Sequence, residues 1–228
     1  MSVAERQGQA ELLGGTIHLL RNAVFTLSAT IDALETHDEQ PLAGCLEHVD
    51  VMRDALSSLT ELASDLDTLC GPALPPSVTS FAVADWLRRL VAVARELAVR
   101  RTVTLVESCG ADVGSWRGDA EALADASIRL IVYGVLRTPA GGCVRVSVER
   151  VAHAGRDVLR LTSTDGGLAL EPNELARVFL PFARLPGPRP ALRLAVADLV
   201  CRRNGGVARA ESASGGVCLT LELLGEAG

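Results

Sequence analysis

A heptad pattern of apolar residues runs through residues 11–35 and limits what the start of the chain can form. The gaps alternate between four and three residues along the row Leu13, Ile17, Leu20, Val24, Leu27, Ile31 and Leu34. Such a row is typical of a helix that packs lengthwise against other helices. A second row with the same alternation extends from Leu42 to Cys70. The polar turn at residues 36–41 lies between the rows, so we expect a long antiparallel helical hairpin.

An isolated hairpin leaves one side of each apolar row in water. A second copy of the chain would cover that side, so the pattern predicts a homodimer that forms a four-helix bundle. His18 stands directly beside the first row, with Arg21 and Asn22 one turn further on. Residues three and four positions from the histidine share its face of the helix. These three side chains are therefore candidates for a functional site, and the alternative is a solvated histidine without chemistry.

The composition excludes several classes of function. The 22 basic residues include no lysine, which excludes a P-loop or Schiff-base lysine, and the net charge of −6 argues against general nucleic-acid binding. The six cysteines form no C-x-x-C and no metal-ligand spacing with histidine, so we expect free thiols in a reducing compartment and no metal site. No apolar run approaches the ~20 residues of a membrane span, and no signal-peptide pattern starts the chain. These features predict a cytoplasmic protein.

Residues 73–80 are expected to link two domains, 1–72 and 81–228, because the segment at 71–80 is rich in Pro and Gly and ends the heptads. Beyond it, helical and strand patterns are mixed. Helices are predicted at 81–101, 119–136, 174–182 and 190–206, and strands at 102–108, 143–151, 157–165, 205–212 and 216–224. This order predicts an α+β protein whose second domain is an α/β sandwich, with one mixed sheet and helices on one face.

The string from His18 to Val24, HLLRNAV, resembles the phosphoacceptor motif of two-component sensor histidine kinases. That motif reads His, acid, Leu, Arg, Asn or Thr, Pro, Leu; here the acid is Leu19 and the proline is Ala23. The second domain resembles the ATP-binding domain of the same family: Asp165 and Gly167 match its first glycine-rich box, and residues 178–182 match its phenylalanine box. The resemblance covers essentially the whole chain and implies a dimerisation and phosphotransfer hairpin followed by a kinase-type ATPase domain.

Within this resemblance, the nucleotide site departs from the family's pattern. The asparagine that holds magnesium and phosphates aligns with Tyr133, and the one a turn earlier aligns with Arg129. A phenol is a poor ligand for a hard cation, and a guanidinium repels it. Where two glycines of the lid wrap the phosphates, the chain has Ala191 and Arg193. Leu19 also replaces the family's general base. We therefore expect no cofactor, weak or absent ATP binding and no self-phosphorylation.

Two questions about this degenerate site stay open in the sequence. Asp165 is either a remnant adenine contact, which would accept from an exocyclic amine, or the start of an Asp-Gly turn, which we favour. Arg129, Tyr133 and Arg193 either fill the pocket with ion pairs, which we also favour, or bind another anion.

Exchange of a phosphoryl group between His18 and a receiver aspartate requires neither the nucleotide site nor the general base. The imidazole nitrogen is itself the nucleophile, and in this family the receiver brings the aspartate and the magnesium. We therefore expect a histidine phosphotransferase that relays phosphoryl groups between response-regulator receivers, with a hybrid histidine kinase as a further partner. Arg21 would offset phosphate charge, and Asn22 holds the family's water-orienting position. Docking is expected near Leu19, Asn22 and Phe25. The alternatives are a non-catalytic adaptor that regulates a kinase or receiver, and a true ATP-dependent kinase.

Overall fold

The structure, a computed structural model, describes residues 3–35, 42–72, 75–153, 156–188, 190, 192–213 and 215–224. The chain divides into two compact units. We call Met1–Gly71 the helical unit and Pro72–Gly228 the α/β unit. Each unit is described by itself.

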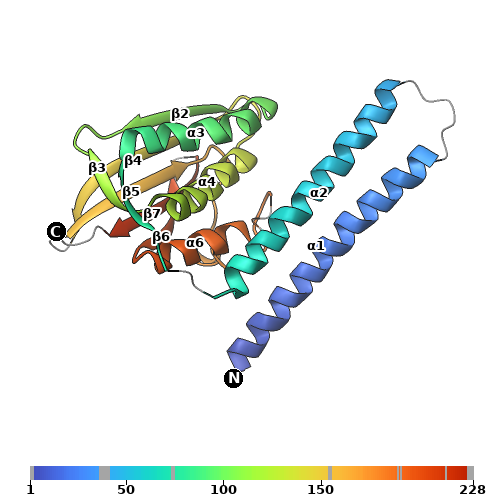
Figure 1. The fold of residues 1–228 in the computed structure, drawn as a ribbon, viewed down its shortest axis with the longest axis horizontal. Coiled ribbons are helices and arrows are strands. Elements are labelled where there is room, and N and C mark those ends of the chain that lie inside the picture. The colour runs from blue at the N-terminus through green and yellow to red at the C-terminus, as the bar shows by residue number, and fades with distance from the viewer. Residues whose placement is uncertain are drawn as a thin grey trace. The chain divides into compact units, whose positions relative to one another are not determined.

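The helical unit consists of two long helices that pack against each other. Helix α1 spans Val3–Glu35 and helix α2 spans Leu42–Cys70. The two helices run in opposite directions (Figure 1). The predicted turn at 36–41 lies outside the described residues. Among the helices of the described residues, none is both long enough and apolar enough to cross a membrane.

The face of α1 that is covered within the chain coincides only in part with the heptad row, of which Leu27 is half-buried. Four residues of the row form an exposed stripe and keep at least 42% of their surface in solvent: Ile17, Leu20, Val24 and Ile31. The covered face is half-buried at Leu19 and Ala23 and buried at Thr30. Smaller side chains such as Ala23 and Thr30 let two helices approach closely. The single chain contains two helices of the predicted bundle, so the bundle itself stays a prediction.

The α/β unit is built on a five-stranded mixed sheet in the order β2-β4-β5-β7-β6. Strands β2 and β4 are parallel, and the other neighbours are antiparallel. A separate two-stranded sheet pairs β1 with β3. The strands are β1 Val78–Ala82, β2 Thr104–Cys109, β3 Ser115–Asp119, β4 Cys143–His153, β5 Arg156–Thr164, β6 Val207–Ala213 and β7 Gly216–Leu224. The helices are α3 Val83–Arg100, α4 Ala120–Arg137, α5 Pro172–Leu175 and α6 Arg193–Arg203.

Helices α3, α4 and α6 cover one face of the five-stranded sheet (Figure 1), which confirms the predicted mixed sheet with helices on one face. Alternation along the strands explains this arrangement, since Val144, Val146 and Val148 of β4 are all at most 1% exposed. The same period on β5 buries Leu159 and Leu161. The core therefore lies between the sheet and the helix layer.

Two sequence expectations for this unit were wrong. The helix predicted at 174–182 is limited to the four residues of α5, and turns follow it up to Pro181 and Phe182. Proline cannot continue a helical ladder, and Phe182 has a left-handed φ of 53°. Strands β1 and β3 were not expected, because each has only five residues and its partner lies far away in the sequence.

Candidate functional site

His18 lies on an exposed face of α1 and is hydrogen-bonded to Asn22. The amide nitrogen Nδ2 of Asn22 lies 3.2 Å from Nε2 of His18, one turn away. An amide nitrogen donates, so this contact is a hydrogen bond in the imidazole tautomer that carries its proton on Nδ1 and accepts at Nε2. The two predicted residues therefore contact each other on the exposed face of α1.

A row of polar side chains continues from this pair along α1. The hydroxyl of Thr26 donates to the backbone oxygen of Asn22 over 3.0 Å. The hydroxyl of Thr30 donates to the backbone oxygen of Thr26 over 2.7 Å. Both threonines thus bond to the backbone one turn earlier, a pattern common for hydroxyls inside helices. The side-chain amide of Asn22 is left to interact with His18.

Arg21 and Phe25 share the face of His18, whereas Leu19 does not. Arg21 is exposed, and no residue in the described part of the chain forms an ion pair with it. Phe25 is 72% exposed. Successive residues of a helix point about 100° apart, so Leu19 turns away from His18 and is half-buried on the covered face. Of the three predicted docking residues, Asn22 and Phe25 are therefore accessible beside the histidine.

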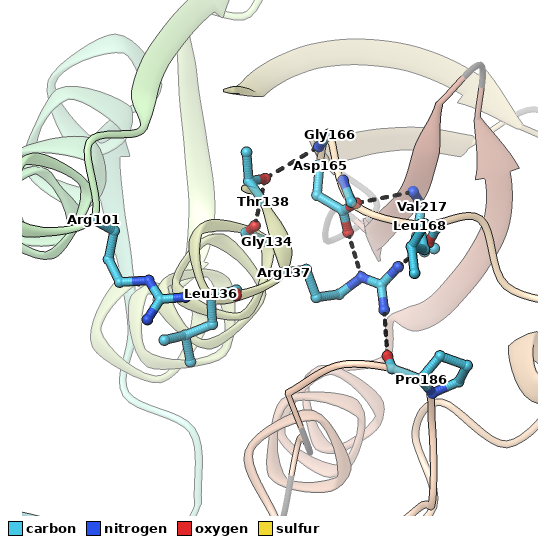
Figure 2. A network of polar contacts seen from close by, with 11 residues as sticks. Arg101, Gly134, Leu136, Arg137, Thr138, Asp165, Gly166, Leu168, Pro186 and Val217 are labelled. Atoms are coloured by element: carbon cyan, nitrogen blue, oxygen red, sulfur yellow. Dashed lines mark hydrogen bonds and ion pairs between the residues drawn. The ribbon is translucent and has the colours of Figure 1, made fainter. Parts of the chain in front are cut away.

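The α/β unit contains a second polar site, centred on a buried ion pair between Arg137 and Asp165. Arg137 is the last residue of α4, and Asp165 follows β5. The Nε of Arg137 donates to Oδ2 of Asp165 over 2.9 Å (Figure 2). The two side chains are only 2% and 1% exposed. A buried charge needs a partner of opposite charge, and each residue supplies it to the other.

The second oxygen of Asp165 is bonded to the backbone. Oδ1 accepts from the amide of Gly167 over 2.8 Å and from the amide of Val217 over 3.2 Å. Both contacts require a close approach of the chain. A Cβ at Gly167 would lie 2.7 Å from the carbonyl oxygen of Arg137, and one at Gly216 would lie 2.0 Å from the carbonyl oxygen of Asp165. The glycines thus serve the packing around this carboxylate.

The remaining nitrogens of the Arg137 guanidinium bond to two loops. Nη1 donates to the carbonyl of Pro186 over 3.3 Å, and Nη2 donates to the carbonyl of Leu168. Figure 2 shows the guanidinium between Asp165 and these two carbonyls. It also lies over the ring of Tyr133, 5.8 Å from the ring centre. We call Arg137, Asp165 and the four backbone groups that bond to them the Asp165 network.

Tyr133 is fully buried beside this network. Among the described residues, its hydroxyl has no hydrogen-bond partner. Burial raises the pKa of the phenol, and the nearby Arg137 only partly offsets that effect. Tyr133 is therefore a neutral, packed side chain at the position where the resemblance to histidine kinases implies a metal-binding asparagine.

Comparison with known proteins gives two curated relatives, and no family model matches the chain. The sensor protein DivL of Caulobacter vibrioides is 28% identical over 221 residues, which cover 94% of this chain and 28% of DivL. The signal transduction histidine-protein kinase/phosphatase MprB of Mycolicibacterium smegmatis is 27% identical over 218 residues, which cover 90% of this chain and 42% of MprB. The chain thus spans less than half the length of either relative.

Solved structures extend the similarity to the fold. The Acinetobacter baumannii histidine kinase AdeS has a TM-score of 0.73 at 16% identity and covers 92% of this chain and 98% of its own. The histidine kinase ThkA, solved in complex with the response regulator TrrA, also has a TM-score of 0.73 at 16% identity, covering 97% of this chain and 65% of that chain. This chain has the fold of a histidine kinase core.

Within the histidine kinase fold, the other residues predicted for the nucleotide site lie outside the Asp165 network. The Nε of Arg129 donates to Oδ2 of Asp125 over 2.8 Å, one turn earlier on α4. Arg193 is the first residue of α6 and is half-buried. Ala191 lies outside the described residues. Arg129 thus pairs with a neighbour on its own helix, and the residue that reaches Asp165 is Arg137.

Arg137 is the residue that sequence reasoning missed. Its signal was its position one turn after Tyr133, which places both side chains on one face of α4. A second signal was the scarcity of charge around Asp165, since a buried carboxylate requires a cation. The two residues are 28 positions apart, and only the return of β5 beside α4 brings them together.

Proposed function

We propose that this protein is a two-component phosphotransfer protein in which His18 exchanges a phosphoryl group with the aspartate of a receiver domain. The observation that carries the proposal is the geometry of His18, which is exposed and has Nδ2 of Asn22 at 3.2 Å from its Nε2. A nucleophile that must meet another protein has to be accessible and must attack through an unprotonated nitrogen. His18 is accessible, and the imidazole tautomer with its proton on Nδ1 offers Nε2 for the attack.

The exchange is a simple displacement at phosphorus. The lone pair of Nε2 attacks the phosphorus of an aspartyl phosphate and forms the P–N bond. The P–O bond to the aspartate breaks, and its electron pair remains on the aspartate carboxylate. The proton on Nδ1 stays in place during this step, so no general base is needed. The reverse reaction returns the phosphoryl group to a receiver, with magnesium supplied by the receiver.

Arg21 and Asn22 would assist this exchange from the same face. Arg21 is exposed and lacks an ion-pair partner among the described residues, so its guanidinium is available for the phosphoryl oxygens. The amide of Asn22 must leave Nε2 before the attack, and it is then placed to donate to the transferred group. Both residues lie within one turn of the attacking atom.

The phosphoryl group would come from a receiver and not from ATP. The residues at the nucleotide position do not fit an ATP base or its magnesium, because Asp165 is fully buried and already bonded to Arg137 and two amides. Leu19 cannot take a proton, so the family's general base is missing as well. A histidine without a base or a bound nucleotide depends on a donor that is already activated, such as an aspartyl phosphate.

The exposed stripe of α1 supports a dimer that leaves His18 free. Ile17 of the stripe directly precedes His18, and Val24 directly precedes Phe25. Successive residues of a helix point about 100° apart, so the stripe points away from the face that carries His18 and Phe25. On α2, Val49 and Leu56 are also at least 39% exposed. Two copies that joined these stripes would form the four-helix bundle and bury exposed apolar surface.

A receiver domain in the cytoplasm is the partner that fits this surface. Phe25 offers a large apolar contact one turn beyond Arg21, so an aromatic side chain and a cation flank the histidine. The related fold of ThkA has been solved with a response regulator. A hybrid histidine kinase carries the same kind of receiver and is a second candidate.

A non-catalytic adaptor is the second candidate function, and one observation favours it. The hydrogen bond from Asn22 covers the same lone pair that phosphotransfer needs. In an adaptor, this bond would be permanent, and the face around Phe25 would bind a kinase or receiver without chemistry. Binding would then be unaffected by the substitution His18→Ala.

Phosphotransfer from purified receivers separates the two functions. Receivers from the same organism are phosphorylated with labelled acetyl phosphate, and the excess acetyl phosphate is removed. Each phosphorylated receiver is then mixed with the wild type, His18→Ala or His48→Ala. The control residue His48 is half-buried on α2 and lacks the motif. The proposal predicts acid-labile label on the wild type and on His48→Ala but none on His18→Ala. Label that persists in His18→Ala, or no label on the wild type with any receiver, contradicts it.

A further inference from the structure

The Asp165 network holds together three segments that are far apart in the sequence. Arg137 ends α4, Asp165 and Leu168 belong to the loop between β5 and α5, and Pro186 belongs to the loop between α5 and α6. One guanidinium bonds to all three partners at once (Figure 2). A planar guanidinium with several fixed N–H donors suits such a role, whereas an ammonium would not replace it.

We infer that Arg137 is a built-in substitute for the base of a nucleotide. In the resemblance that the sequence shows, the carboxylate at Asp165 would accept from the exocyclic amine of adenine, and the loops before α6 would close over the phosphates. In this chain, Arg137 donates to that carboxylate and ties both loops. The loops of the α/β unit are therefore held in place by the Arg137 side chain, and no nucleotide is required to hold them.

A nucleotide cannot compete well for this position. The contact between Arg137 and Asp165 is a charge-assisted bond, which is about twice as strong as one to a neutral amine. A base that displaced Arg137 would leave a guanidinium buried without its counter-charge. Tyr133 also packs against the guanidinium on its other side. Each of these features favours the internal partner over a ligand.

The inference goes beyond the phosphotransfer function and does not depend on it. It concerns only residues of the α/β unit, and a failure of His18 to accept phosphate would leave it intact. Its test therefore uses no receiver and no phosphoryl donor. It needs the full-length chain, variants of Arg137 and a matched variant of another arginine on the same helix.

The inference is tested by removing the Arg137 side chain and adding free guanidinium ions that can take its place. Arg137→Ala removes the guanidinium and leaves space of its shape beside Asp165. The matched control is Arg129→Ala, two turns earlier on α4, which loses an ion pair to the half-exposed Asp125. Thermal midpoints are measured with guanidinium chloride at about 50 mM, far below denaturing levels, and with sodium chloride at equal concentration.

We expect Arg137→Ala to lower the thermal midpoint by roughly 10 °C and Arg129→Ala by no more than about 3 °C. Guanidinium should raise the midpoint of Arg137→Ala by several degrees and leave the wild type and Arg129→Ala unchanged or slightly lower. Millimolar ATP with magnesium should leave the wild type within about 1 °C. Equal effects of guanidinium on all three proteins, or stabilisation of the wild type by ATP, would overturn the inference.

A second variant covers the case in which Arg137→Ala does not fold. Arg137→Lys keeps the positive charge but cannot reach the carboxylate and both carbonyls together. Amide hydrogen exchange is then followed in the loop segments 166–170 and 183–188. Exchange at least about tenfold faster than in the wild type in both segments supports the inference, because the loops have lost their common anchor. Unchanged exchange in both segments contradicts it.

Discussion

The two polar sites of this chain differ in how completely their hydrogen bonds are satisfied. His18 is exposed and contacts Asn22, while its neighbour Arg21 has no ion-pair partner in the described part of the chain. Arg137 and Asp165 are buried, and five hydrogen bonds join their side chains to each other and to the backbone. The Arg137 guanidinium also lies over the Tyr133 ring. A site that must meet a partner keeps bonding capacity free. A site that is internally satisfied stabilises the fold.

This difference predicts opposite results for substitutions in the two units. A change on the exposed face of α1 removes a group that acts on a partner, and it leaves the packing of the chain unaltered. A change in the Asp165 network leaves a buried polar group without its bond, so it lowers the free energy of unfolding. Phosphotransfer and stability should therefore respond separately, which the following substitutions test.

His18→Ala should have the largest effect of all, and only on activity. Loss of the nucleophile should lower phosphotransfer by a factor on the order of 10³ or more. Because the side chain is exposed, the free energy of unfolding should stay within about 0.5 kcal/mol of the wild type. Urea unfolding and label transfer from a receiver measure the two quantities. A marked loss of stability would show that His18 belongs to the core of the fold.

Asp165→Asn should have the largest effect on stability. It keeps the shape of the side chain but leaves the Arg137 guanidinium buried without a counter-charge, which should cost about 3–5 kcal/mol. Asp125→Asn is the control. Asp125 pairs with Arg129 but is 51% exposed, so water screens this carboxylate and its loss should cost less than about 1 kcal/mol. Denaturant midpoints give both values. Similar losses for the two variants would contradict the account of the network.

Gly167→Ala should have an intermediate effect on stability. An added Cβ would lie 2.7 Å from the carbonyl oxygen of Arg137, so the loop must shift, at a cost of about 1–3 kcal/mol. Gly110→Ala is a suitable control, since its Cβ would meet its nearest atom at 3.5 Å, an ordinary contact. If both variants unfold at the wild-type midpoint, close packing around Asp165 is not what requires glycine there.

Phe25→Ala should have the smallest effect, and again only on activity. The side chain is 72% exposed, so its loss should leave stability within about 0.5 kcal/mol of the wild type. As a docking contact it should raise the apparent KM for the receiver about tenfold. Val99→Ala, 71% exposed on α3, controls for the loss of an exposed apolar side chain. Equal KM values for the two variants would remove Phe25 from the docking surface.

The sequence predicted those parts of the fold that depend on local patterns. Alternation along 143–151 and 157–165 identified β4 and β5, and the apolar face of 81–101 identified α3. The heptad row located α1 but only part of its covered face, because Ile17, Leu20, Val24 and Ile31 of the row are exposed while Ala23 and Thr30 beside it are covered. Strands β1 and β3 were not predicted, because strands this short carry little local pattern and are stabilised by pairing with a partner that is distant in the sequence.

The candidate site was predictable in one unit and only partly in the other. His18, Arg21 and Asn22 are neighbours on one helix, so spacing alone places them together. Arg137 and Asp165 meet only when β5 has paired with β4 and returned beside α4. Sequence reasoning predicted a changed nucleotide site at Tyr133, but it did not identify Arg137 as the cation that pairs with Asp165.

The central claim is that His18 receives its phosphoryl group from a receiver and not from ATP, and comparing labelling from these two donors tests it most directly. The wild-type protein is incubated in parallel with γ-labelled ATP and magnesium, and with a labelled phospho-receiver without ATP, with His18→Ala in both arms. The account predicts label on the wild type from the receiver alone and no label on His18→Ala in either arm. Label on His18 from ATP alone, without any receiver or kinase, would contradict it.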